Sequence, residues 1–290
     1  MRDRRGTLAA RSLALAYGLL AALPLSAAGA STHVEVAELG SVSATFTYQE
    51  SRNQYGGEKT SHPALTISRA GSIVYSSPVT SPWCEIEECS PAYGGPDVHL
   101  ATLEPGHEPD VVLDLYTGGA HCCYIEQVFS GPGANGVTMA ERDFGNGRAR
   151  LEPLGPEGQD VFVSVDNRFA YAFTDYADSG LPVQVWALSG AVFIDVTRQY
   201  PSLISADAAR EWRYYKGDSH NDVGFFAAWA ADEELLGRGA LVSQRLNAEL
   251  KRGRLRVSAV LERLGYAGGK RFARSLRSDL RRWGYTPAGS

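Results

Sequence analysis

The four cysteines are the residues of this sequence best suited to covalent chemistry. They form two close groups, Cys84 with Cys89 and Cys122 with Cys123, and an even count favours two disulfide bonds. A bond between the neighbours Cys122 and Cys123 would close a strained eight-membered ring. We therefore expect crossed bonds that join the first group to the second, with the choice between the two crossed pairings open. Closing loops of that size stabilises a fold by about 3–4 kcal/mol in the chain-entropy estimate.

The same cysteines could instead form a metal or thiol site. His121 directly precedes Cys122 and Cys123, and its imidazole would suit zinc together with these thiolates and one from Cys84 or Cys89. Adjacent residues of an extended strand point to opposite faces, however, which makes joint ligation of one ion difficult. A cysteine nucleophile paired with His121 would lose its thiolate on oxidation. We therefore expect disulfides here, with no metal and no catalytic residue.

Four aspartates and His121 are the candidates for binding a ligand or a cation. Asp110 and Asp114 lie in a strand-like segment, and Asp175 and Asp178 lie in a polar loop beside aromatic residues. The loop pair could bind a cation or a sugar, and a plain turn explains it equally well. The four aspartates are also the acids that a hydrolase would use. The sequence has neither a Gly-x-Ser-x-Gly elbow nor a His-Glu-x-x-His helix, so the common hydrolase motifs are missing.

A strand-and-glycine segment carries a family resemblance. Residues 110–119, Asp-Val-Val-Leu-Asp-Leu-Tyr-Thr-Gly-Gly, resemble FG-GAP or VCBS-type repeats of exported β-rich proteins. Residues 118–123, Gly-Gly-Ala-His-Cys-Cys, are similar to a segment of uncharacterised bacterial exported proteins. The resemblance implies a β-rich fold outside the cytoplasm and carries no catalytic residue. Because residues 104–110 lack the alternating Asp/Asn pattern of a calcium loop, we expect no cofactor, with calcium as the open alternative.

The N-terminus predicts export. Arginines at positions 2, 4 and 5 precede an apolar run over residues 13–25, and small residues follow at 26–30. These are the three regions of a secretory signal peptide, which we assign to residues 1–30, with cleavage after Ala30 or, as the alternative, after Ala28. A retained membrane anchor and twin-arginine export are the competing interpretations. After cleavage we expect no stable transmembrane segment and a secreted or periplasmic location.

Residues 31–200 have the pattern of an acidic, antiparallel β-rich domain. Residues 64–67 and 72–75 are expected to pair across a turn at Ala70-Gly71, and residues 183–188 and 192–196 across Ser189-Gly190. Phe169, Tyr171 and Phe173 are expected on one face of a further extended segment. A sandwich or a set of partial, propeller-like sheets is the predicted architecture.

Residues 201–290 have helical periodicity instead. The pattern predicts helices over 207–215, over 223–250 as one long or two shorter segments, and around 257–264, with Asn221 or Asp222 as an N-cap. Phe272, Leu276, Leu280 and Trp283 form the apolar stripe of a last helix that ends at Gly284. The predicted fold class is thus α+β, a β-rich domain followed by a small helical region.

The charge distribution supports a division near residue 200. Residues 31–200 contain 8 basic and 22 acidic side chains, whereas residues 201–290 contain 16 basic and 10 acidic ones. The acidic balance and the predicted export argue against a nucleic-acid partner. We expect a non-catalytic binding or envelope-associated module that engages an extracellular or envelope ligand or protein. The alternative is an extracellular or periplasmic hydrolase that acts on a cell-wall or extracellular polymer.

Overall fold

The computed structural model describes residues 30–52, 57–84, 89–92, 95–119, 122–133, 136–217 and 222–286. The predicted signal peptide therefore lies outside the described residues, apart from Ala30. His121 also lies outside them. Among the described residues, no helix is long and apolar enough to cross a membrane.

Strands come first along the chain and helices follow, which confirms the α+β prediction. The described strands are β1 Ser31–Leu39, β2 Val42–Arg52, β3 Glu58–Arg69, β4 Ser72–Pro78, β5 Ser90–Pro91, β6 Val98–Ala101, β7 Asp110–Gly119, β8 Cys122–Gly133, β9 Gly136–Asp143, β10 Arg150–Glu152, β11 Val161–Val165, β12 Val183–Ser189 and β13 Val192–Asp195. The helices are α1 Pro201–Gly217, α2 Val223–Leu235, α3 Gly239–Lys251, α4 Ala259–Arg263 and α5 Gly269–Arg282. Short 3-10 turns lie at Pro156–Gly158, Asn167–Phe169 and Thr197–Gln199.

The strands form three antiparallel sheets. The first sheet has the order β1-β2-β3-β4, and the third has the order β10-β11-β12-β13. The middle sheet has the order β5-β7-β8-β9, and β6 also pairs with β7. Neighbours along the chain are mostly neighbours in the sheets, because short turns join antiparallel strands.

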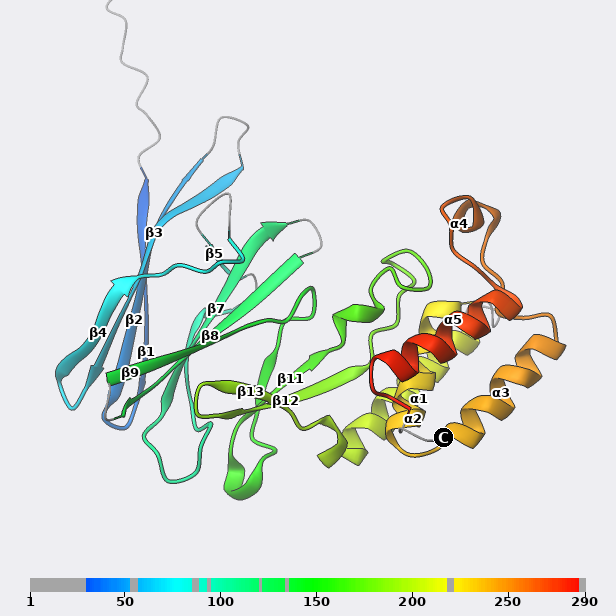
Figure 1. Ribbon diagram of the computed structural model, residues 1–290. Helices are drawn as coiled ribbons and strands as arrows, with labels where there is room; N and C mark the ends of the chain where they lie inside the picture. Colours follow the sequence, from blue (N-terminus) through cyan, green and yellow to red (C-terminus); the bar gives the residue numbers. More distant parts are fainter. Residues whose placement is uncertain are drawn as a thin grey trace, which may run out of the picture.

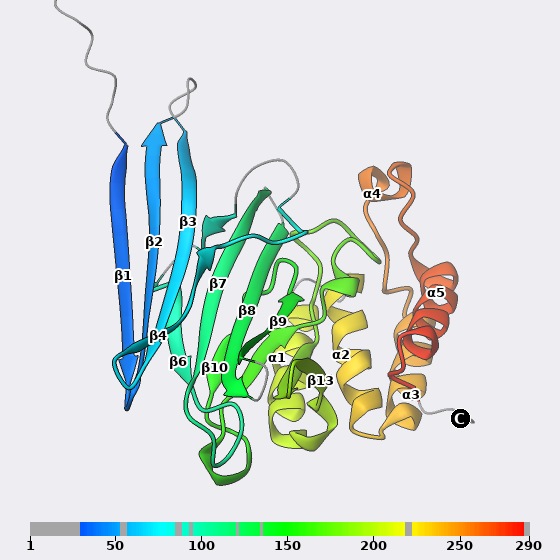
Figure 2. The same ribbon diagram turned by 60° about the vertical axis from the view of Figure 1, so that its left-hand side comes forward.

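The sheets and helices stack as successive layers (Figure 1). The first sheet packs on one face of the middle sheet through alternate residues such as Phe46, Leu65, Leu113 and Ile125. Figure 2 shows the first sheet at one end of the molecule and α3 and α5 at the other. The middle sheet is thus an inner layer, which explains why β7 is buried almost without interruption.

The third sheet covers the other face of the middle sheet. Val112 of β7 and Val128 of β8 contact a second apolar cluster that includes Phe162 and Leu188 of the third sheet. The remaining face of the third sheet, with Val185, packs on α1. Each interior strand therefore has its apolar side chains divided between two cores by the alternation of the pleat.

The helices form a core of their own. Asp222 caps α2 as predicted, and its side chain accepts hydrogen bonds from the backbone N–H groups of Gly224 and Phe225 at 3.1 and 3.3 Å. The predicted stripe of α5 packs in this core, and Gly284 follows the end of α5 with a φ of 83°. The predicted segment 223–250 forms two helices, α2 and α3, because Gly237 turns the chain between them with a φ of 74°.

Both predicted hairpins are confirmed. Ala70 and Gly71 have φ values of 46° and 76° and join β3 to β4, as a two-residue turn requires. Gly190, with a φ of 59°, lies in the turn between β12 and β13. In both hairpins the positive φ of the turn residues reverses the chain, so a few neighbouring residues are enough to form the turn.

The prediction of an extended segment around Phe173 is wrong. Phe169 ends a 3-10 turn, Tyr171 has a φ of 60°, and residues 170–180 contain no strand. Phe169 and Phe173 both pack in the helical core, and their rings are 6.0 Å apart. The aromatic spacing therefore reflects turns docked on helices rather than the period of a strand.

Candidate functional site

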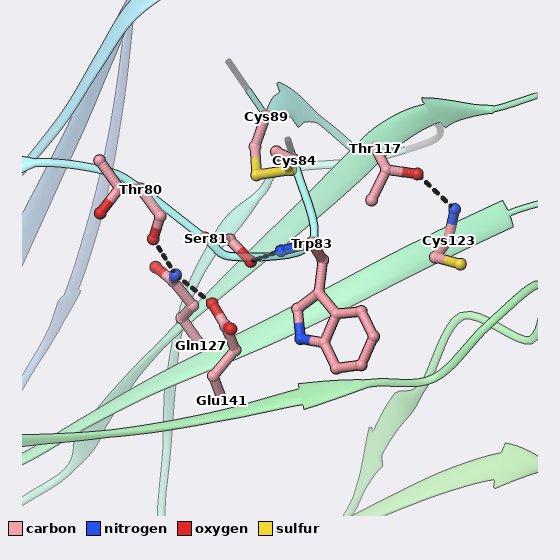
Figure 3. The surroundings of a disulfide bond; sticks show 9 residues. All are labelled: Thr80, Ser81, Trp83, Cys84, Cys89, Thr117, Cys123, Gln127 and Glu141. Atoms are coloured by element: carbon pink, nitrogen blue, oxygen red, sulfur yellow. Dashed lines mark hydrogen bonds between the residues drawn. A yellow bond between two sulfur atoms is a disulfide. The ribbon is translucent and has the colours of Figure 1, made fainter. Parts of the chain in front are cut away.

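The described disulfide joins Cys84 to Cys89, and this contradicts the expected crossed pairing. The two Cα atoms are 5.4 Å apart and the cysteines are five positions apart in the sequence, so the bond closes one short covalent loop (Figure 3). Cys123 is also disulfide-bonded. The crossed prediction failed because Cys84 and Cys89 lie within bonding reach of each other. A loop of this size stabilises the fold by about 2 kcal/mol, less than we expected.

Hydrogen bonds tie the chain before this loop to the middle sheet (Figure 3). The Gln127 side chain donates to the Thr80 carbonyl at 2.8 Å and to Glu141 at 2.6 Å. Nearby, the backbone N–H of Cys123 donates to the Thr117 hydroxyl at 2.8 Å. The oxidised sulfurs of Cys84, Cys89 and Cys123 are not thiolates, so these three residues serve the fold. Among the described residues, no group of three His, Cys, Asp or Glu side chains is placed to hold a metal ion.

The predicted acids occupy two different environments. Asp110 and Asp114 lie on the face of β7 toward the third sheet, and both are buried. Asp175 and Asp178 instead form a turn in which the Asp178 N–H donates to the Asp175 carboxylate at 3.2 Å. That turn lines a shallow cavity of about 440 Å³ against Leu261 and its neighbours of α4. The structure thus places the two pairs of acids apart and does not gather all four in one cleft.

Asp114 belongs to a buried charge cluster. Arg148 donates to its carboxylate at 2.5 Å, and the His99 ring nitrogen lies 3.2 Å from it. Burial works against the charged form, but Glu126, His99 and Arg148 outweigh it and hold the Asp114 pKa below its ordinary value. Glu126 lies directly across on β8, where burial and the Asp114 charge raise its pKa well above the ordinary value. These opposite shifts favour the anion at Asp114 and the neutral acid at Glu126.

Asp97 extends the cluster along the edge of the middle sheet. Its carbonyl accepts a hydrogen bond from the Asp114 N–H at 2.8 Å, and its own N–H donates to Glu35 of β1 at 2.7 Å. Burial and the neighbouring Glu35 raise the pKa of Asp97 to about 8. The cluster holds protons in the interior between layers and lines none of the cavities described here.

A similar acid group joins α1 to α2. Arg210 pairs with Asp207 and Glu211 of α1, and Asp207 accepts a hydrogen bond from the backbone N–H of Val183 at 2.9 Å. Burial and the Asp207 charge raise the pKa of the fully buried Asp232 to about 10. These groups fix the packing of the first two helices on the third sheet.

The strongest candidate for ligand binding is an open cavity of about 420 Å³ beside the third sheet. We call it the Arg142 groove. Its lining comes from β9, β12 and β13 and from Trp283 at the end of α5. Its lining residues are Arg142, Asp143, Phe144, Gly145, Val165, Asp166, Asn167, Arg168, Gln184, Trp186, Asp195 and Trp283. A second cavity of about 260 Å³ shares Arg168, Gln184, Asp195 and Trp283 with it. Together they have the size of a small-molecule site.

Arg142 and Trp186 lie together in this groove. The guanidinium carbon of Arg142 is 3.3 Å from the centroid of a Trp186 ring, a cation–π contact. Buried Nε of Arg142 and buried Nε1 of Trp186 have no hydrogen-bond acceptor within the described parts of the chain. Burial lowers the pKa of Arg142, against the opposing attraction of Asp195 and Asp143. Buried donors without an acceptor are uncommon in folded proteins. The hydrogen bonds of the described residues give the two Nη atoms of Arg142 no acceptor either, and these terminal N–H groups are the ones that a ligand in the groove would contact.

The other two arginines have partners in the protein. Arg168 donates to both carboxylate oxygens of Asp166, at 2.6 to 3.0 Å. Arg198 donates to the carbonyls of Leu235, Gly284 and Tyr285. Asp166 also accepts a 2.7 Å hydrogen bond from the Tyr285 hydroxyl.

These bonds hold the end of α5 against the third sheet and so position Trp283. The contacts run from arginines of the β-rich part, Arg168 and Arg198, to backbone carbonyls at the ends of α2 and α5.

Two further acids of the groove, Asp143 and Asp195, each use one carboxylate oxygen for hydrogen bonds within the protein. Asp143 accepts a 2.6 Å hydrogen bond from the Gly145 N–H through Oδ1. Asp195 uses Oδ1 for the N–H and the hydroxyl of Thr197, at 2.9 and 2.6 Å. In the described parts of the chain, Oδ2 of either residue accepts no hydrogen bond. The groove therefore offers one unpaired planar cation, two carboxylate oxygens and two indole rings.

Sequence reasoning missed this groove. Trp186 and Gln184 alternate with Val183 and Val185 on β12, so their position on the opposite face from α1 could have been read from the predicted strand. No local pattern brought Arg142 or Trp283 to that face, because they are 44 and 97 residues away from Trp186 along the chain.

Comparison with known proteins gives two relatives. The chain is 29% identical over 225 residues to a probable thylakoid lumen protein of Synechocystis sp., covering 69% of this chain and 58% of that protein. It is 27% identical over 188 residues to an uncharacterized protein of Sinorhizobium fredii, covering 61% of this chain and 28% of that protein. The chain thus spans less than two thirds of the length of either relative. No family model and no solved structure matches it.

Proposed function

We propose that this chain is an exported, non-catalytic binding module whose ligand occupies the Arg142 groove. The observation that carries the proposal is the half-buried guanidinium of Arg142, which stacks on Trp186 without a hydrogen-bond acceptor among the described residues. A ligand with an acceptor group would satisfy that cation and remove the cost of burying it unpaired. The resemblance of residues 110–119 to FG-GAP or VCBS-type repeats remains a prediction.

Location outside the cytoplasm is supported by three separate features. The Cys84–Cys89 bond is typical of oxidising compartments, and the N-terminal pattern is that of a signal peptide. One relative is described as a probable thylakoid lumen protein, and a lumen is also an extracytoplasmic compartment. We therefore place the binding module in the secreted or periplasmic space.

Tryptophan fluorescence offers a direct test, since two indoles line the groove. The purified chain is titrated with a panel of soluble saccharides, amino acids and short peptides from cell-envelope digests while its tryptophan emission is recorded. Each compound that gives a saturable change in emission is then titrated by calorimetry to measure its affinity. We expect at least one component to bind, and Trp186→Ala to abolish that binding. Trp83→Ala is the matched control, because Trp83 is exposed and lies outside the groove. A chain that binds nothing in the panel, or whose binding survives Trp186→Ala, would contradict the proposal.

A further inference from the structure

We propose that the Arg142 groove recognises a sugar ring that carries a carboxylate, the chemistry of a hexuronate unit in an acidic saccharide. This inference rests on the function proposed above and names the ligand class of the same site. It is carried by the placement of one unpaired cation, two carboxylates and two indole rings around one cavity.

The cation determines the charged part of the ligand. Arg168 is already bonded to Asp166 and Arg198 to backbone carbonyls, so Arg142 is the groove arginine without an acceptor in the described residues. A guanidinium presents a planar fork of N–H groups that matches a carboxylate in two parallel hydrogen bonds. A carboxylate on the ligand would therefore be bound at Arg142, beside the Trp186 ring.

The acids of the groove argue against a doubly charged ligand. Asp143, Asp166 and Asp195 line the cavity together with Arg142 and Arg168, so the lining has one more acid than base. A phosphate dianion would meet more repulsion from these carboxylates than a monoanion does. With one more acid than base in the lining, the groove favours a ligand with a single carboxylate, bound at Arg142.

The same acids suit the hydroxyl groups of a sugar. Oδ1 of Asp143 and of Asp195 is held by backbone N–H groups, which orients both carboxylates. Their Oδ2 atoms can accept hydrogen bonds from neighbouring hydroxyls, and the amides of Asn167 and Gln184 line the same cavity. Hydroxyl donors next to a carboxylate are what a hexuronate carries and what a simple carboxylic acid lacks.

The indoles provide the surface for the ring. Trp283 is held by two contacts: its ring centroid is 4.8 Å from that of Phe169 and 5.6 Å from the guanidinium carbon of Arg168. Its side chain lines both cavities. The C–H face of a pyranose ring packs on such a flat apolar surface, and the rigid indole loses little conformational entropy on binding. Trp283 and Gln184 line both cavities, so the ring would lie where the two cavities share their lining.

The test uses the full chain and two matched probes. Methyl α-galacturonoside and methyl α-galactoside differ only in the carboxyl group, and each is titrated by calorimetry at neutral pH. We expect the galacturonoside to bind and the galactoside to bind at least about tenfold more weakly, because a hydrogen bond between charged groups is lost. Arg142→Gln should lower the affinity for methyl α-galacturonoside by about 10- to 100-fold. Arg150→Gln, which changes an exposed arginine outside the groove, should leave it unchanged.

Arg142→Lys distinguishes the effect of the positive charge from that of the planar guanidinium. It also shows whether a loss of binding comes from a folding defect. It keeps the positive charge and loses the fork, so we expect an intermediate affinity with an unchanged thermal unfolding temperature. Equal binding of both probes, or equal affinity of the parent and Arg142→Gln, would overturn the hexuronate inference. If neither probe binds while another ligand binds in a Trp186-dependent manner, the hexuronate inference fails and the proposed function stands. If nothing binds in a Trp186-dependent manner, both fail.

Discussion

The guanidinium of Arg142 stacks on the ring of Trp186 at 3.3 Å although no described residue accepts a hydrogen bond from its buried Nε. The two residues come from different sheets, β9 of the middle sheet and β12 of the third. Across the middle sheet, Arg142 also lies in register with Glu126, which in turn lies opposite Asp114. A row of charged residues thus crosses the interior face of this sheet and ends at the groove.

Replacement of Arg142 by methionine tests whether this cation serves the fold or a ligand. A cation–π contact contributes about 0.5–2 kcal/mol, and burial of an unpaired charge offsets it. We expect the free energy of unfolding of Arg142→Met, measured by urea denaturation, to lie within about 1 kcal/mol of the parent value. A loss of 3 kcal/mol or more, as found on breaking a buried ion pair, would make Arg142 a structural residue.

Removal of the Cys84–Cys89 bond should have a modest effect. The loop is short, so the Cys84→Ser, Cys89→Ser double variant should lose about 2 kcal/mol of unfolding free energy. In a chain of this size the loss lowers the unfolding temperature by roughly 4–8 °C. Peptide mapping without reduction gives the independent check, and a peptide that links Cys84 to Cys123 would refute the pairing.

Glu126 and Asp114 should respond differently to amide substitution. Burial and the Asp114 charge raise the pKa of Glu126 well above its ordinary value and favour its neutral form, so Glu126→Gln should change stability by less than about 1.5 kcal/mol. Asp114→Asn removes the anion that Arg148 and His99 contact, and should cost about 3–5 kcal/mol. Chemical denaturation of the two variants at pH 7 compares them directly. Equal losses would mean that the proton is not held on Glu126.

Asp97 should make stability fall as the pH rises. Its pKa is 3.8 in a free side chain and about 8 in the folded chain, so the folded state holds the proton more tightly. The stability that this group contributes is complete below pH 3.8 and is lost as the pH rises toward and through 8. We expect the parent to lose roughly 1 kcal/mol per pH unit relative to Asp97→Asn between pH 4 and 7.

Denaturation curves at several pH values measure this slope for Asp97. Glu38→Gln, at an exposed position on β1, is the control and should show the parent slope. Parallel pH profiles for the parent and Asp97→Asn would contradict the assignment of a raised pKa to Asp97.

The hydrogen bond from Tyr285 to Asp166 should contribute both to the stability of the fold and to the position of Trp283 in the groove. Tyr285→Phe removes the hydroxyl that donates to Asp166, a buried acceptor that keeps its bonds to Arg168, and should cost about 1–2 kcal/mol. Because Trp283 is two residues away, its fluorescence emission should shift as well. Tyr214→Phe is the control, since Tyr214 is half exposed and should leave both stability and emission unchanged. An unchanged unfolding temperature for Tyr285→Phe would show that this hydrogen bond does not hold the C-terminal segment.

The sequence alone determined the local elements of this protein. Ala70-Gly71 could form a hairpin turn whatever surrounded it, and the spacing of Phe272, Leu276 and Leu280 could only produce an apolar face on a helix. Period-2 and period-3.6 patterns act over a few residues, so strands, helices and the α+β order followed from them. The pattern was misleading at Phe169 and Phe173, where two aromatic residues pack on helices from a turn.

Tertiary structure alone decided the disulfide partners and the groove. Cys84 bonds to Cys89 because their Cα atoms lie 5.4 Å apart, a distance that sequence counting cannot supply. Arg168 and Trp283 contact each other across 115 residues of chain, and Arg142 meets Trp186 only because the middle and third sheets pack face to face. Such contacts depend on which layers stack and in what register, and that is settled by the summed burial of many apolar side chains rather than by any one segment.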